Sequence, residues 1–151
     1  MTLHRLDKSA VRRAGETLST AFMHYPYFKY CDPDEGHRFD TLHKMFELVM
    51  RGALLKGSVY ATSPRCEGVA MWLPPEHAYI TNLQTLRVLL AMPSVLRMGT
   101  KTLGKAMAFS DWEALQRKQL ARFPHWYLWL IGVDPSHQGK KMASALIRPM
   151  L

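Results

Sequence analysis

The sequence predicts an α/β fold in which a mixed sheet is flanked by helices. One observation is the order of the expected elements: two helices, two strands, a helical segment, one strand and one helix. Another is size, because 151 residues that are 48% hydrophobic and 21% charged suit a single domain over residues 1–151 with a sizeable core. The third is an apolar strand, Trp126–Val133, that leads through turn residues into a short helix.

The N-terminal part of the chain predicts helices on both sides of an aromatic loop. Asp7 is a good N-cap for the first helix, and apolar residues from Ala10 to Phe22 recur at helical spacing. Pro26 ends this helix because a proline in a helix interior removes a hydrogen bond. The elements expected here are a short strand over 2–6, a helix over 8–23, an aromatic loop over 24–30, a turn over 32–36 and a second helix from Phe39 to about Gly57.

Two short strands follow the second helix. Residues 59–62 and 68–73 are rich in apolar and β-branched side chains, and they flank the turn Ser63–Arg65. Pro74 and Pro75 end the second strand, because proline cannot donate to a sheet ladder. The pair therefore predicts two neighbouring strands of one sheet.

Residues 77–124 predict a helical insert with an unusually basic first part. Pro93 and Gly99 are expected to divide the insert, and Ser110–Glu113 resembles a cap that starts a new helix through Arg122. The insert either guides an anionic acceptor, rests on a membrane surface, or presents an ordinary solvated helix face. Between His77 and Ser110 there is no acid, and the basic residues are Arg87, Arg97, Lys101 and Lys105.

The strand Trp126–Val133 and the residues after it organise the chain. Because the strand is apolar on both faces, it is predicted to be central and buried. Asp134–Ser136 ends it, and the polar segment His137–Lys141 leads into a helix. A helix start offers unpaired backbone N–H groups and Gly139 permits close approach, so the loop is suited to hold a phosphate. The alternative is an ordinary strand–loop–helix connection with a solvated basic turn.

Residues Val133–Leu146 resemble the acetyl-CoA signature of the GNAT superfamily of N-acetyltransferases. In that signature a Val-x-Pro strand end precedes Gln/Arg-x-x-Gly-x-Gly/Ala and an apolar helix. Gln138 and Ala143 match its first and last positions, whereas Lys141 stands where the family usually has glycine. The resemblance implies a mainly antiparallel sheet and a site for acetyl-CoA.

A second set of motifs is similar to puromycin N-acetyltransferase-like proteins. Ala21-Phe22-x-x-Tyr25-Pro26, Val69–Trp72 with Pro75-Glu76, the helical insert and the signature occur in the same order. The similarity implies a small bacterial acetyltransferase that moves an acetyl group from acetyl-CoA to a primary amine of a small molecule or peptide. A non-catalytic protein of the same fold, which binds CoA or a partner, is the alternative function.

The cofactor site implied by the resemblance combines strand and loop. Backbone groups of Ile131, Gly132 and Val133 are expected to hold the thioester carbonyl and to stabilise developing negative charge, with Gly132 relaxing the ladder. The alternative is that these three are ordinary sheet residues. On the loop, the expected cofactor contacts are Gln138, Gly139, Lys140, Lys141, Met142, Ala143 and Ser144.

Three residues are expected to take part in catalysis: Tyr25, Glu76 and His125. Tyr25 belongs to the resembled motif, Glu76 follows a strand and two prolines, and His125 begins the last strand with a side chain that changes charge near neutral pH. Tyr25, Tyr30 and Trp72 are the expected acceptor-binding residues. The structural alternatives are an aromatic lid for Tyr25, a solvated acid for Glu76, a surface histidine for His125 and a core position for Trp72.

Charge and composition restrict the possible partners. A net charge of +8 and a pI of about 9.7 favour polyanions, anionic membrane surfaces or phosphorylated cofactors. No nucleic-acid recognition motif is present, so no nucleic-acid partner is expected, and no apolar run is long enough to span a membrane. Cys31 and Cys66 form no disulfide framework and no signal segment is visible, which favours the cytoplasm. His24 and His37 lack zinc-ligand spacing, so no metal is expected.

The sequence ends at Leu151, just after the signature helix, where the resembled fold continues with further strands and a helix. The resemblance therefore implies a family member whose C-terminal part is missing, or one that a partner completes. Such a chain is expected to have little activity, because the usual proton donor for the thiolate lies in the later part. An exposed edge and apolar surface would favour a homodimer.

Overall fold

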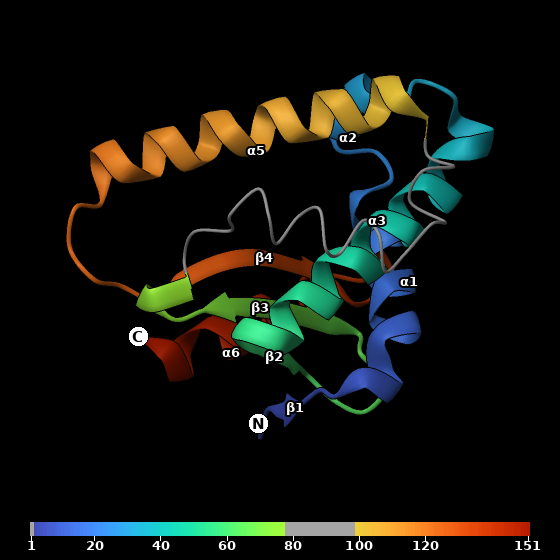
Figure 1. Ribbon diagram of the computed structural model, residues 1–151. Coiled ribbons are helices and arrows are strands. Elements are labelled where there is room, and N and C mark those ends of the chain that lie inside the picture. The colour runs from blue at the N-terminus through green and yellow to red at the C-terminus, as the bar shows by residue number, and fades with distance from the viewer. Residues whose placement is uncertain (1, 78–98) are drawn as a thin grey trace.

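Four strands form one antiparallel sheet in the computed structural model, which describes residues 2–77 and 99–151 (Figure 1). The strand order is β1-β2-β3-β4, and each neighbouring pair is antiparallel. The α/β class with a mainly antiparallel sheet is thus confirmed. The strands are β1 (His4–Arg5), β2 (Ser58–Ala61), β3 (Gly68–Leu73) and β4 (Tyr127–Val133).

Helices cover both faces of the sheet. The first and third helices pack on one face and the last packs on the other, so the described chain has three layers (Figure 1). Within the described residues no helix is both long enough and apolar enough to cross a membrane. The helices are α1 (Val11–Phe22), α2 (Pro26–Cys31), α3 (Glu35–Lys56), α5 (Thr100–Leu120) and α6 (Met142–Ile147), with 3-10 turns at Lys8–Ala10, Pro75–His77, Pro135–His137 and Arg148–Met150.

A bulge in β4 decides which side chains face each layer. Trp72 pairs with Leu128 and Met71 pairs with Leu130, so Trp129 is an extra residue in β4. As a result Trp129 and Leu130 both pack against the core beneath α1 and α3, whereas Leu128 packs on the α6 side. The bulge therefore places two consecutive large side chains of β4 on the same face of the sheet.

The aromatic segment after α1 contains a short helix, although the sequence pattern predicts a loop. Tyr25 has an extended backbone, and α2 begins at the next residue, Pro26. Proline is tolerated at the first helical position because the N–H that it lacks has no partner there. The prediction that Pro26 ends the preceding helix is confirmed, but the loop prediction is wrong because the same proline also begins a new helix.

α5 is one continuous helix, although Ser110–Glu113 predicts a new helix start. Serine and aspartate inside a helix cost less than about 0.7 kcal/mol each, so a cap-like sequence does not force a break. Contacts with α2 also hold the helix, as when Thr102 Oγ1 donates to the Cys31 carbonyl oxygen at 3.2 Å. The helix begins just after Gly99, as predicted, while the predicted division at Pro93 lies outside the described residues.

A buried arginine fixes the connections on either side of α2. Arg38 is only 4% exposed. Its guanidinium donates to the carbonyl oxygens of Asp32 at 2.7 Å, Met23 at 3.2 Å and Pro33 at 2.8 Å. Because a buried cation is stable only when its donors are used, these bonds hold in place the two connections that flank α2, the first of which contains Tyr25.

Candidate active site

β4 lies at the edge of the described sheet, although the apolar pattern predicts a central, buried strand. Its side chains are only half-buried, apart from the buried Gly132. Helices α1 and α6 cover its two faces, which accounts for the apolar composition. The prediction is wrong because, among the described strands, β4 pairs with β3 alone. The side of β4 that faces away from β3 therefore has backbone groups that can bind a ligand.

Backbone groups alternate along this open edge. Asp134 N donates a 2.8 Å hydrogen bond to the chain just before β3, which continues the ladder between the two strands. In an antiparallel pair every second residue faces the same neighbour, so Gly132 faces β3 while Ile131 and Val133 face outward. On that outer side the Val133 carbonyl oxygen accepts a hydrogen bond from Gln138 Nε2 at 3.1 Å. Gln138 therefore steadies the strand end.

Gly132 has a packing role of its own. A Cβ at this position would lie 2.7 Å from Leu18 Cδ2 and 3.2 Å from Phe22 Cε2. The missing side chain therefore allows α1 to lie directly on β4. This contact sets the position of the strand whose outer edge forms the candidate site.

The loop after β4 contains two residues with left-handed backbone conformation. Gly139 has φ 78° and Lys141 has φ 58°. Glycine adopts this region freely, whereas it costs a residue with a side chain roughly 1–2 kcal/mol. Asp134 caps the turn through Ser136, whose hydroxyl lowers the pKa of the Asp134 carboxyl. Lys141 thus occupies a strained position in an otherwise well-capped loop.

The first turn of α6 presents its amides at the surface. Helical hydrogen bonding begins where Ala145 N donates to the Lys141 carbonyl oxygen at 3.1 Å. The amides of Met142, Ala143 and Ser144 precede that bond, so they have no acceptor within the helix. Ala143 and Ser144 are exposed and Met142 is half-buried. The segment can therefore donate several backbone hydrogen bonds to an anion.

A pocket of about 590 Å³ opens where β4 begins. It brings together Glu76 and His125, two of the predicted catalytic residues. His125 Nδ1 lies 2.7 Å from the Phe123 carbonyl oxygen, which can only accept, so Nδ1 carries the proton and Nε2 of the neutral ring keeps a lone pair. The described lining is Pro75, Glu76, Lys118, Ala121, Arg122, Phe123, Pro124 and His125.

The three predicted acceptor-binding residues do not line this pocket. Tyr25, just before α2, and Tyr30, within α2, are both exposed. The Tyr25 ring meets the Phe22 ring edge-on, with 5.8 Å between the ring centroids. The Lys105 ammonium lies 4.2 Å from the Tyr30 ring centroid and donates to the Tyr30 carbonyl oxygen at 2.7 Å. Trp72 is 5% exposed and packs in the core beneath α6, as its structural alternative predicts.

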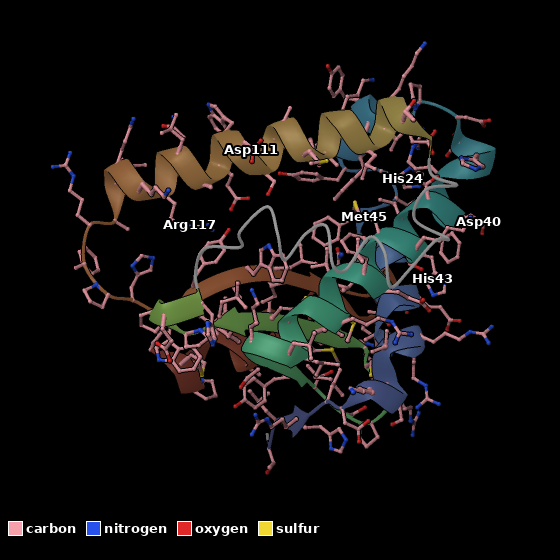
Figure 2. The ribbon with its side chains drawn as sticks, in the orientation of Figure 1. His24, Asp40, His43, Met45, Asp111 and Arg117 are labelled. Atoms are coloured by element: carbon pink, nitrogen blue, oxygen red, sulfur yellow. The ribbon has the colours of Figure 1, made fainter. Side chains whose placement is uncertain are left out.

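A polar cluster that sequence reasoning does not reveal connects α5 to β4. The Tyr127 hydroxyl donates to the Glu113 carboxylate, and the Arg117 guanidinium lies 3.9 Å from the Tyr127 ring centroid and 3.5 Å from that carboxylate. Figure 2 shows Arg117 on the side of α5 that faces the sheet. Burial, and then the bond to Glu113, raises the pKa of Tyr127. Only the i,i+4 spacing of Glu113 and Arg117 is visible in the sequence.

Comparison with known proteins agrees with this geometry. A sequence profile of the "Acetyltransferase (GNAT) family" matches residues 60–151, which is more than half of the chain. The structure is similar to that of a Corynebacterium glutamicum protein described as "histone acetyltransferase HPA2 and related acetyltransferase". This match has a TM-score of 0.61 and 21% sequence identity, and it covers 98% of this chain and 68% of that chain. At this identity the likeness shows the fold.

Proposed function

The chain belongs to the acetyltransferase (GNAT) family, and from this premise we propose that it is an acetyl-CoA-dependent N-acetyltransferase acting on a primary amine. The observation that carries the proposal is the unit formed by β4, the following loop and α6. In this unit an open strand edge leads directly into a loop with two left-handed residues and an exposed helix start. The similarity to puromycin N-acetyltransferase-like proteins supports a small-molecule amine as the acceptor.

The loop fits a phosphorylated cofactor. A Cβ built on Gly139 has nothing within 4 Å, so a ligand can approach the backbone closely, and Lys140 and Lys141 are both exposed. In our proposal the first-turn amides of α6 hold the pyrophosphate, and the outward backbone groups of Ile131 and Val133 hold the arm that follows the strand edge. When bound, acetyl-CoA would supply an acetyl thioester, whose C–S bond breaks as the C–N bond to the amine forms, so that CoA leaves as a thiolate and takes up the proton that the amine releases.

On the acceptor side, His125 is the proposed general base. Its Nε2 takes a proton from the acceptor amine, so that the amine nitrogen has a lone pair with which to attack the thioester carbonyl. Glu76 lines the same pocket and attracts the ammonium form of the amine, which brings it to His125. Tyr25 and Tyr30 lie near the start of α5, away from this pocket, so they have no part in the proposed acceptor site. Trp72, being buried, supports β4 from the core.

We expect CoA to bind with an affinity that falls as salt increases, because charge contributes to phosphate binding. Ala143→Asp is expected to weaken binding by about tenfold, because its carboxylate repels the phosphate. The helix itself should not be weakened, since an acid is favourable at a helix start. Calorimetric titration of each protein at two salt concentrations measures these effects.

The matched control for this titration is Ala143→Ser, which introduces a polar but neutral side chain at the same exposed position. Its CoA affinity should stay close to that of the original protein. A folded protein that binds no CoA would contradict the cofactor assignment. CoA binding without acetyl transfer to any amine would instead favour the non-catalytic alternative.

Lys141→Gly is expected to retain CoA binding and to raise the free energy of unfolding by up to about 1.6 kcal/mol. Relief of the left-handed strain is worth roughly 1–2 kcal/mol, and the greater freedom of glycine in the unfolded chain offsets about 0.4–1 kcal/mol of this. Urea unfolding and CoA titration measure the two quantities. Lys141→Ala, which removes the charge without relieving the strain, is the control. If Lys141 contacts phosphate, both variants should instead lose affinity by about 1–3 kcal/mol.

A further inference from the structure

The pocket at the start of β4 has more positive than negative charge. Among its described lining residues Lys118 and Arg122 are cations, Glu76 is an acid, and His125 gains a positive charge when protonated. The whole chain is also cationic, with a net charge of +8. Such a pocket attracts an anionic group and repels a strongly basic peptide.

Arg122 is the lining cation that fits an anion best. The residue is exposed, and its Nε donates to the Gln119 carbonyl oxygen at 3.4 Å, near the end of α5. A guanidinium carries five N–H donors in a planar fork that matches a carboxylate, and this bond uses one of them. The bond therefore orients the side chain while its terminal nitrogens stay suited to a ligand.

The rest of the described lining is apolar. Phe123 is 67% exposed, and Pro75, Ala121 and Pro124 lie around the same pocket. An exposed phenylalanine beside prolines offers a surface for the apolar body of a ligand. The volume of about 590 Å³ lies in the range of small-molecule sites.

From this arrangement we propose that the acceptor is a small molecule that carries a carboxylate beside its primary amine and an apolar body, as an apolar α-amino acid does. Arg122 binds the carboxylate, Phe123 contacts the apolar body, and the amine lies by His125 and Glu76. This inference rests on the proposed acetyl transfer and adds the chemical class of its acceptor. The same charges make a lysine-rich peptide a poor acceptor.

The test compares phenylalanine, leucine and alanine with their three amides, in which a neutral carboxamide replaces the carboxylate. Thiol release gives kcat/KM for each pair with the original protein, Arg122→Met and the control Arg65→Met. Arg65 is an exposed arginine in the turn before β3, at the opposite end of that strand from the pocket. We expect the acids to be preferred by about tenfold or more, as one charge-assisted contact provides. Arg122→Met should bring the ratio close to one, and Arg65→Met should leave it unchanged.

Equal kcat/KM for acids and amides, or a preference that survives Arg122→Met, would overturn the inference while leaving acetyl transfer intact. If no amine is acetylated, equilibrium binding of the same six compounds tests the anion site separately. Binding is detected by tryptophan fluorescence, because Trp126 lies next to His125 in the chain and is exposed. Acids that bind more tightly than amides, with the difference lost in Arg122→Met, would support the anion site although the proposed function fails. Absence of any such difference would overturn the inference too.

Discussion

His125→Asn is expected to lower kcat/KM for acetyl transfer by about 10²–10⁴-fold, the usual contribution of a general base. The asparagine amide can take the place of Nδ1 and donate to the Phe123 carbonyl oxygen, so the local backbone keeps its partner. Nothing replaces Nε2, and the amine must then lose its proton to water. The loss corresponds to about 3–5 kcal/mol of transition-state stabilisation. Thiol release over a range of amine concentrations measures it.

The control for this variant is His4→Asn, because His4 is exposed on β1, at the opposite edge of the sheet from β4. It should retain full turnover, and both variants should bind CoA as the original protein does. The variant Glu76→Gln distinguishes the contribution of the Glu76 carboxylate from that of the His125 imidazole, since both line the pocket. A large loss with Glu76→Gln but not with His125→Asn would move the role of base to the carboxylate.

Helices and strands that are determined by their own residues, rather than by contacts with distant parts of the chain, are predicted well from the sequence. The Asp7 side chain accepts from Ser9 N, as an N-cap should, and the uninterrupted apolar run of β3 is buried at every position. α2 and the continuous α5 are not predicted, because their sequences are ambiguous locally. A proline can end one helix and begin another, and contacts with distant residues decide the outcome.

The candidate site is predicted only where its residues are contiguous in the chain. The loop after β4 is one segment, so its composition alone suggests an anion site. Glu76 and His125 come together because Leu73 pairs with Tyr127, which brings the end of β3 beside the start of β4. No local pattern encodes that pairing. The sequence therefore does not show that Glu76 and His125 share a pocket from which Tyr25 is absent.

Gly57→Ala is expected to lower the free energy of unfolding by about 3 kcal/mol, near the upper end of the range for an overfilled interior. Gly57 caps the C-terminus of α3, where a Cβ would lie 2.0 Å from the Trp72 carbonyl oxygen and 3.0 Å from Leu73 Cδ2. A backbone oxygen cannot rotate aside, so either the helix end or β3 must move. Urea unfolding followed by circular dichroism measures the change.

The matched control for this variant is Gly104→Ala in α5, where a Cβ would have nothing within 4 Å. That variant should be more stable by about 0.5–1 kcal/mol, because alanine favours a helix. Displacement of Trp72 by Gly57→Ala also disturbs β4, since Trp72 pairs with Leu128 beside the bulge. The folded fraction of Gly57→Ala should therefore transfer acetyl groups more slowly than the original protein. Unchanged stability and turnover would show that α3 and β3 separate at no cost, and the tight contact would then have no part in positioning the site.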